Sequence, residues 1–244
     1  GVFDGKITGT VDYFLDKRDD IFMKRNHMPL TTGLADQTPM ANVGKMKSQG
    51  WDGSITLSHR VGEVDLTLRG NFTYQKTEII DKDEAANELW YKMQKGFQLD
   101  QSRGLIALGL FKDQDDIDSS PTQTFGGKTV LPGDIKYKDV NGDGKIDGDD
   151  EVPLGYREKP GLQYGAGLSA RWKNFNLSVL FQGTGKCDFF VGGSGPHAFR
   201  YGRTGNILQV MVDGNRWIPR EISGTADTEN PNADWPRLTY DNNN

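Results

Sequence analysis

Alternating apolar and polar residues form the dominant pattern of this chain. The clearest case runs from Glu63 to Gln75, where one face would carry Val64, Leu66, Leu68, Gly70, Phe72 and Tyr74. The opposite face would carry Asp65, Thr67, Arg69, Asn71, Thr73 and Gln75. Strict period-two alternation over a dozen residues predicts a half-apolar β-strand that is longer than the usual five or six residues. One face of such a strand could contact lipid while the other contacts water.

Four further segments alternate in the same way. Together with the first, they predict strands at about residues 5–16, 46–59, 63–77, 163–172 and 175–183. Tight turns at Arg60-Val61-Gly62 and at Lys173-Asn174 would join the second strand to the third and the fourth to the fifth. The other connections are long, including residues 79–162. Short and long connections therefore alternate, and all the long loops should lie at one end of the sheet.

This alternation of loop lengths is typical of outer-membrane barrels, which have short periplasmic turns and long extracellular loops. We therefore expect an all-β fold, a segment of an antiparallel up-and-down transmembrane β-barrel with long extracellular loops. Five strands cannot close a barrel, since about eight is the smallest bacterial number, so we expect residues 1–244 to belong to a larger protein. Within the loop 79–162, residues 83–95 predict a short helix with an apolar stripe of Leu89, Trp90 and Met93 that packs on the sheet.

A secreted β-sandwich binding module stabilised by calcium is the alternative architecture. In that case exposed aromatic side chains such as Trp217 and Trp235 would stack on glycans. The two architectures differ in the fate of Leu66, Leu68 and Phe72. A closed sandwich buries these side chains against a second sheet, whereas a barrel exposes them to lipid.

Composition narrows the possible functions. Glycine contributes 31 of 244 residues and hydrophobic residues only 35%, which suits a β protein with many loops. A net charge of −5 gives no electrostatic reason to expect nucleic acid as a partner. Cys187 is the single cysteine, so no disulfide can form within the chain. No nucleophile elbow of the G-x-S-x-G type and no complete phosphate loop is present, and we expect no enzyme activity.

One acidic loop has the spacing of a calcium site. Residues 139–150 read DVNGDGKIDGDD and place oxygen side chains at loop positions 1, 3, 5, 9 and 12, with Gly144 at position 6. Calcium needs several converging oxygens and a sharp turn that glycine makes cheaply, and Ile146 would pin the loop to its support. The predicted ligands of Ca²⁺, in a structural role, are Asp139, Asn141, Asp143, the Lys145 carbonyl, Asp147 through a water, and Asp150. A solvated acidic turn is the alternative, because Asp, Asn and Gly are ordinary turn residues.

The same region carries a family resemblance. Residues 132–147, PGDIKYKDVNGDGKID, followed by Gly155, a Tyr-Gly strand and Lys173-Asn174-Phe175, resemble the SusC/RagA-type TonB-dependent outer-membrane transporters. Phe181-Gln182-Gly183, Asn215-Arg216-Trp217, Asn230-Pro231 and Pro236-Arg237 add to the match, as does Asn42-Val43-Gly44 leading into Gly50. The resemblance covers nearly the whole chain.

The resemblance implies a 22-stranded barrel with an N-terminal plug in the outer membrane of a Gram-negative bacterium. It implies a SusD-like surface lipoprotein as partner, TonB as the source of energy, and oligosaccharides or peptides as the imported substrate. Residues 1–244 contain no plug and no TonB box, so we expect a C-terminal part of the barrel. The partners would then be the lipoprotein, the substrate, outer-membrane lipid and, through regions absent here, the TonB complex.

Overall fold

The computed structural model describes residues 1–25, 31, 33, 38–123, 129–191, 198–199 and 206–239. It divides into two compact units, each formed by two stretches of the chain. Unit 1 comprises Gly1–Ser102 and Pro153–Phe189, and unit 2 comprises Arg103–Val152 and Phe190–Asn244. Among the described residues, no helix is both long and apolar enough to cross a membrane.

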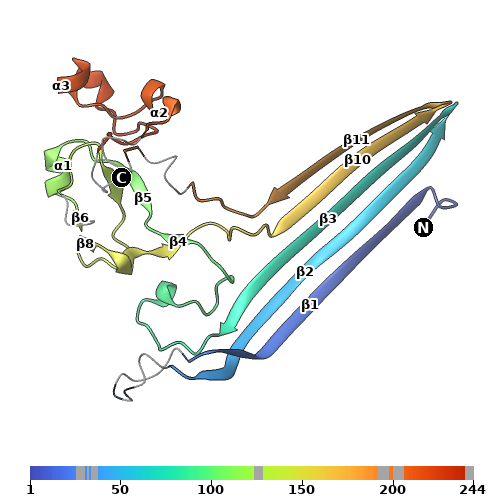
Figure 1. Ribbon diagram of the computed structural model, residues 1–244, viewed down its shortest axis with the longest axis horizontal. Coiled ribbons are helices and arrows are strands. Elements are labelled where there is room, and N and C mark those ends of the chain that lie inside the picture. The colour runs from blue at the N-terminus through green and yellow to red at the C-terminus, as the bar shows by residue number, and fades with distance from the viewer. Residues whose placement is uncertain are drawn as a thin grey trace. The chain divides into compact units, whose positions relative to one another are not determined.

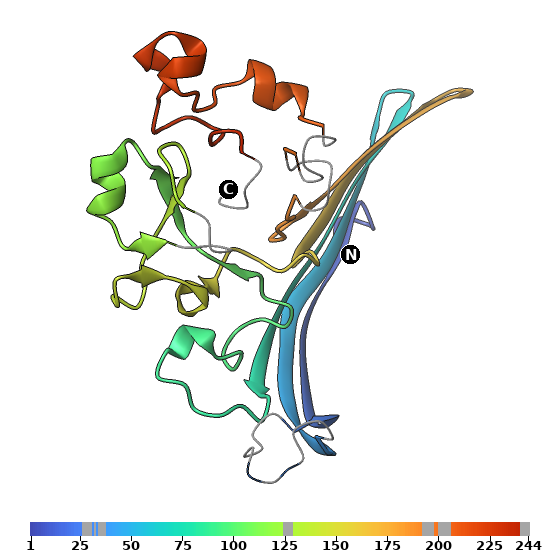
Figure 2. The same cartoon turned by 60° about the vertical axis from the view of Figure 1, so that its left-hand side comes forward.

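A five-stranded antiparallel sheet makes up most of unit 1 (Figure 1). Its strands are β1 (Ile7–Lys24), β2 (Met40–Val61), β3 (Val64–Asp81), β10 (Leu162–Trp172) and β11 (Phe175–Gly185), in that spatial order. Each strand lies where the alternation predicts one. The first three are longer than predicted because they continue beyond the alternating segments. Figure 2 shows the sheet nearly edge-on, curving along its length.

Both tight connections lie at the same end of the sheet, as predicted (Figure 1). Lys173 and Asn174 join β10 to β11. The connection between β2 and β3 is Gly62-Glu63 rather than Arg60-Val61-Gly62, because Arg60 and Val61 still pair with Asp65 and Val64. Gly62 has a φ of +61°, a conformation that glycine adopts without steric cost. The two turns are linked by the Glu63 carboxylate, which lies 3.3 Å from Lys173 Nζ and accepts a 3.3 Å hydrogen bond from Trp172 Nε1.

The helix predicted for residues 83–95 is wrong; the structure has only the 3₁₀ turn η3 (Trp90–Lys92) there. The Glu84 carboxylate accepts hydrogen bonds from the backbone N–H groups of Gln94 and Lys95, at 3.0 to 3.1 Å, so these donors are not used in a helix. The predicted stripe also fails, since Trp90 is 69% exposed and Tyr91 is the buried residue. The segment is attached to β3 instead, through backbone bonds between Ile79 and both Gly96 and Phe97.

Unit 2 is built from short elements rather than from a large sheet. They are β4 (Arg103–Gly104), β5 (Ala107–Leu110), α1 (Gln114–Asp118), β6 (Thr122–Gln123), β7 (Ile135–Tyr137), β8 (Lys145–Ile146), η5 (Gly148–Asp150), the first residue of β9 (Val152–Pro153), α2 (Gln209–Asp213), α3 (Arg220–Ser223) and η7 (Ala226–Thr228). β5 pairs with β7, and β6 with β8. A small core of buried side chains holds them together: Leu110, Phe111, Val130, Ile146, Met211 and Trp217.

The C-terminal segment of unit 2 is fastened to this core by a buried ion pair. Asp134 is 0% exposed and accepts hydrogen bonds from Arg237 Nε at 2.5 Å and Nη2 at 3.1 Å. Beside it, the Arg237 backbone N–H donates to the Gly133 carbonyl at 2.9 Å. Gly133 has a φ of +86°, and a Cβ there would lie 2.4 Å from the Trp217 ring. Trp217 is therefore packed over a glycine and only 5% exposed, so it is not the glycan platform of the alternative architecture.

Candidate functional site

One face of the five-stranded sheet is a continuous apolar band. Paired residues share a face, and their registers build six successive cross-strand rows. From the tight turns upward these rows are Val61, Val64, Trp172 and Phe175; His59, Leu66, Ala170 and Leu177; Ile7, Leu57, Leu68, Leu168 and Val179; Gly9, Ile55, Gly70, Ala166 and Phe181; Val11, Gly53, Phe72, Tyr164 and Gly183; and Tyr13, Trp51, Tyr74, Leu162 and Gly185. Leu68 is 46% and Phe72 40% exposed. These exposed side chains contradict the sandwich, which would bury them.

The height of this band fits a bilayer. From Trp51 to Val61, β2 advances ten residues, which is about 33 Å along a strand at about 3.3 Å per residue. Barrel strands tilt by about 40°, so the band would be about 25 Å tall, the height of the apolar band of outer-membrane barrels. The next row toward the long loops contains Leu15, Gln49 and Lys76, and polar residues follow.

Aromatic side chains occupy both borders of the band. Trp172 and Phe175 stack at the turn end with ring centroids 6.2 Å apart. Tyr13 and Trp51 lie at the other border, with centroids 4.9 Å apart. Aromatic girdles of this kind mark the two membrane–water interfaces of barrels, because an amphipathic ring is stable at the boundary between lipid and water.

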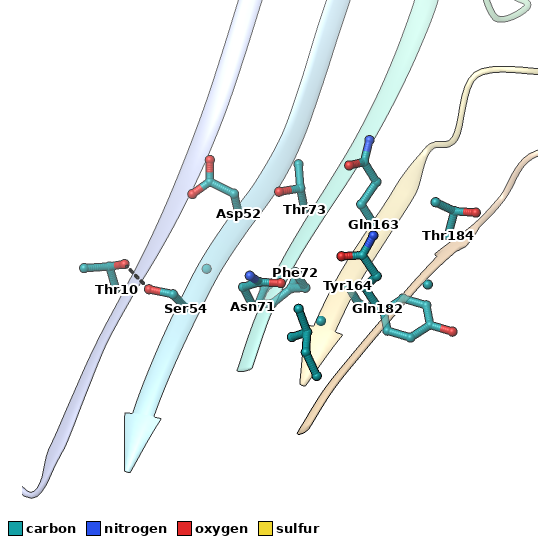
Figure 3. A pocket seen from close by; sticks show the side chains of 14 residues that line it. Thr10, Asp52, Ser54, Asn71, Phe72, Thr73, Gln163, Tyr164, Gln182 and Thr184 are labelled. Atoms are coloured by element: carbon teal, nitrogen blue, oxygen red, sulfur yellow. Dashed lines mark hydrogen bonds between the residues drawn. The ribbon is translucent and has the colours of Figure 1, made fainter. Parts of the chain in front are cut away.

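The opposite face of the sheet is polar and hollowed. Figure 3 shows hydroxyl, amide and carboxylate side chains from all five strands along a shallow groove of about 670 Å³. Its polar lining side chains are Thr10, Asp52, Ser54, Asn71, Thr73, Gln163, Gln182 and Thr184. The Thr10 and Ser54 hydroxyls are hydrogen-bonded at 3.1 Å. Such a surface offers many donors and acceptors to water, to a solute or to a polypeptide backbone.

The predicted calcium loop lies in unit 2, and its turns are stabilised by its own carboxylates. Asp139 accepts hydrogen bonds from the N–H groups of Gly142 at 2.6 Å and Gly144 at 2.9 Å. Gly144 has a φ of +82°, which confirms the predicted need for glycine. Ile146 is 3% exposed and anchors the loop, as expected.

The remaining predicted ligands are distributed along the same loop. Asp150 is fully buried and accepts from the N–H groups of Val140 at 2.7 Å and Asp147 at 3.0 Å. Asn141 and Asp143 accept from loop amides two residues further on. Over the described part of the chain, however, no three His, Cys, Asp or Glu side chains are gathered closely enough to hold a metal ion. Calcium binding therefore stays a prediction.

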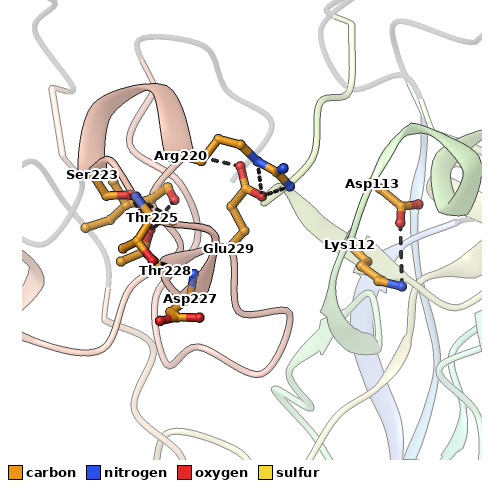
Figure 4. A network of polar contacts seen from close by, with 9 residues as sticks. Lys112, Asp113, Arg220, Ser223, Thr225, Asp227, Thr228 and Glu229 are labelled. Atoms are coloured by element: carbon orange, nitrogen blue, oxygen red, sulfur yellow. Dashed lines mark hydrogen bonds and ion pairs between the residues drawn. The ribbon is translucent and has the colours of Figure 1, made fainter.

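Two polar contacts add local order to unit 2. Lys136 Nζ donates to Asp116 Oδ1 at 2.7 Å, and this hydrogen bond lowers the pKa of the Asp116 carboxyl below its ordinary value. Figure 4 shows Arg220 next to Glu229. This ion pair closes the turn that contains α3 and η7. The Arg220 guanidinium donates to Glu229 Oε2 at 2.5 and 2.9 Å, and this contact lowers the pKa of Glu229. These contacts stabilise the short turns of unit 2.

The comparisons with known proteins agree with this architecture. Residues 2–181 match the family model for the TonB dependent receptor-like β-barrel. The chain belongs to this family, whose members are transporters of the Gram-negative outer membrane rather than enzymes. It is 28% identical over 251 residues to TonB-dependent receptor P26 of Formosa agariphila, a match that covers 98% of this chain and 23% of that protein.

Solved structures show the same fold. The RagAB peptide importer in its "closed-closed" state matches with a TM-score of 0.51 and 19% identity, over 76% of this chain and 20% of the other. The "open-open" state matches with a TM-score of 0.53 and 18% identity, over 76% and 19%. The chain therefore spans about a quarter or less of the proteins that it matches.

Proposed function

We propose that this chain forms part of an outer-membrane active transporter of the SusC/RagA type. The observation that carries the proposal is the sheet itself. One face is an apolar band of about 25 Å with aromatic borders, which suits lipid, and the other is a polar wall, which suits an aqueous or plugged lumen. The long connections would then face the cell exterior, where a substrate arrives.

The motif DVNGDGKID within residues 132–147 supports assignment to the SusC/RagA group. The similar structures are those of the RagAB peptide importer, which supports peptides as one substrate class. The hydroxyl and amide side chains of the polar wall would hydrogen-bond peptides and oligosaccharides equally well. We infer a SusD-like surface lipoprotein as partner and TonB as the source of energy from the same resemblance.

Loss of the gene that encodes this chain is expected to abolish energy-dependent uptake of its substrate class. Uptake of fluorescent oligopeptides and of fluorescent oligosaccharides would be measured in parent and deletion cells, each with and without a protonophore. We expect one substrate class to lose its protonophore-sensitive uptake on deletion and to recover it when the gene is restored. Unchanged uptake of both classes would contradict the transport function.

We also propose that the loop 139–150 binds Ca²⁺ as a structural clasp. The glycine turn, the buried Ile146 and the order of oxygen ligands support this proposal. Each ionised carboxyl group has about four acceptor sites. A carboxylate that accepts hydrogen bonds from loop amides therefore still has lone pairs with which to bind the ion. A cation would also offset the negative charge of the five Asp residues in this loop.

Chelation is expected to destabilise this loop in the purified protein. With free Ca²⁺ about 100-fold above Kd, ligand linkage contributes about 2.7 kcal/mol, which excess chelator would remove. Hydrogen exchange within residues 136–155 should rise and the melting temperature should fall. Asp143→Asn should weaken the response to Ca²⁺, whereas Asp149→Asn, in the same loop but outside the predicted ligand set, should retain it. A melting temperature indifferent to chelator, with no metal found by mass spectrometry, would contradict the proposal.

A further inference from the structure

The polar face contains a smaller hollow that is lined by one cationic side chain, Arg69. This hollow, of about 330 Å³, receives polar side chains from four strands and an apolar one from β11. Its side chains on the polar face are Ser54, Thr56, Arg69, Asn71, Ser169, Ser178 and Leu180. The registers place Arg69 directly between Thr56 on β2 and Gly167 on β10. The guanidinium therefore stands in the middle of the sheet rather than at an edge.

Among the residues that the structure describes, no carboxylate forms an ion pair with Arg69. No lining residue of the hollow is acidic. By contrast, Arg60 on the same face lies 3.6 Å from Asp65. A guanidinium offers five N–H donors in a planar arrangement that matches a carboxylate, so the hollow is suited to bind an anionic acceptor.

Two glycines leave room for such an acceptor. Gly165 and Gly167 contribute no side chain to the floor of the hollow on β10. A Cβ at Gly165 would approach Asn71 Oδ1 to 2.8 Å, so a larger residue would displace that amide. The Ser169 and Ser178 hydroxyls are hydrogen-bonded to each other at 3.0 Å, which leaves the pair one further O–H donor at the rim. Positive charge, amide and hydroxyls thus surround one open volume.

We propose that this hollow binds the carboxylate of an aspartate or glutamate side chain on a polypeptide segment that packs against the polar face. Leu180 favours a polypeptide over a small free acid, because this apolar side chain stands 69% exposed beside the polar side chains that line the hollow. A packed segment buries Leu180 and supplies the carboxylate together, whereas a small anion leaves the leucine in water. The relatives are about four times longer than this chain or more, and carry ample polypeptide to provide the segment.

The inference rests on the polar face being the inner wall proposed above. Its first test is a photo-crosslinking amino acid at Leu180 in the full-length receptor in cells. The matched control is Leu177, on the same strand but on the apolar face, where it is 64% exposed. Leu180 should crosslink within the receptor to a segment carrying Asp or Glu at the contact, and Leu177 should not. A crosslink to a separate protein, to a segment without acidic residues, or to nothing would overturn the proposal.

A charge swap supplies the second test. Arg69→Gln and Arg69→Glu should each expose the crosslinked segment to protease. A charge-assisted hydrogen bond of about 1.5–3 kcal/mol corresponds to a roughly 10- to 150-fold faster cleavage. Arg171→Gln, on the same face but opposite Asp65 in register, is the matched control and should leave cleavage unchanged. Arginine at the crosslinked acidic position should rescue Arg69→Glu. Unaltered cleavage, or no rescue, would defeat the inference.

These tests separate the inference from the transport function. A receptor that takes up substrate normally but shows no crosslink at Leu180 would retain the proposed function and lose the hollow's assignment. A specific crosslink to an acidic segment, in a receptor without any uptake activity, would support the assignment of the hollow and contradict the proposed transport function.

Discussion

Replacing Asp134 by alanine is expected to detach the C-terminal segment of unit 2 from its core. The Asp134 carboxylate is 0% exposed and is the bidentate partner of Arg237, whose side chain is only 14% exposed. It also accepts a 2.9 Å hydrogen bond from the Leu131 N–H. Removing one member of a buried ion pair takes this carboxylate away from a charge in a poorly solvated site, which costs about 3–5 kcal/mol.

Hydrogen exchange of the intact protein would measure this effect locally. Residues 129–137 and 215–237 should lose protection together in Asp134→Ala, because backbone bonds such as Arg237 to Gly133 depend on the same docking. Lys112→Ala is the control in the same unit. Its exposed pair with Asp113, at 3.7 Å, should contribute less than about 1 kcal/mol. Equal protection in both variants would show that the buried pair does not hold the segment.

An arginine at Leu68 is expected to impair insertion of the sheet into a bilayer. Leu68 lies in the third of the six apolar rows, between Leu57 and Leu168 and close to the middle of the band. A cationic side chain on the lipid face at the bilayer midplane costs about 2–4 kcal/mol. Thr67→Arg is the matched control, since the neighbouring residue points to the polar face, where a barrel accepts charge.

The comparison would use the full-length receptor, scored by the amount of folded protein in the outer membrane and by its denaturant midpoint in lipid vesicles. Leu68→Arg should lower both, and Thr67→Arg should stay close to the unaltered protein. If the two variants behave alike, the apolar face is not the lipid face, and the transmembrane assignment of the sheet fails.

The sequence alone predicted the strands, because side chains of an extended chain point alternately to the two faces of a sheet. From Val64 to Tyr74 this local rule identified which side chains share a face, and the structure confirmed it. The rule fails at residues 17–24 of β1, where four successive charged residues interrupt the alternation and the register with β2 shifts between Arg18 and Ile21, so this strand is longer than the pattern indicated. It also failed at residues 83–95, where the Glu84 side chain takes the backbone donors that a helix would need.

The sequence by itself thus determined the class of the sheet, its two chemically different faces and the glycine turn of the acidic loop. Beyond the two pairs joined by tight turns, only the tertiary structure decided which strands adjoin, and so which residues form a row across the sheet or line a hollow. Arg69 is surrounded by residues of β2, β10 and β11 as well as its own strand, and Asp134 meets Arg237 across 103 positions. Such contacts depend on register and chain path, which are set by the packing of distant segments rather than by local periodicity.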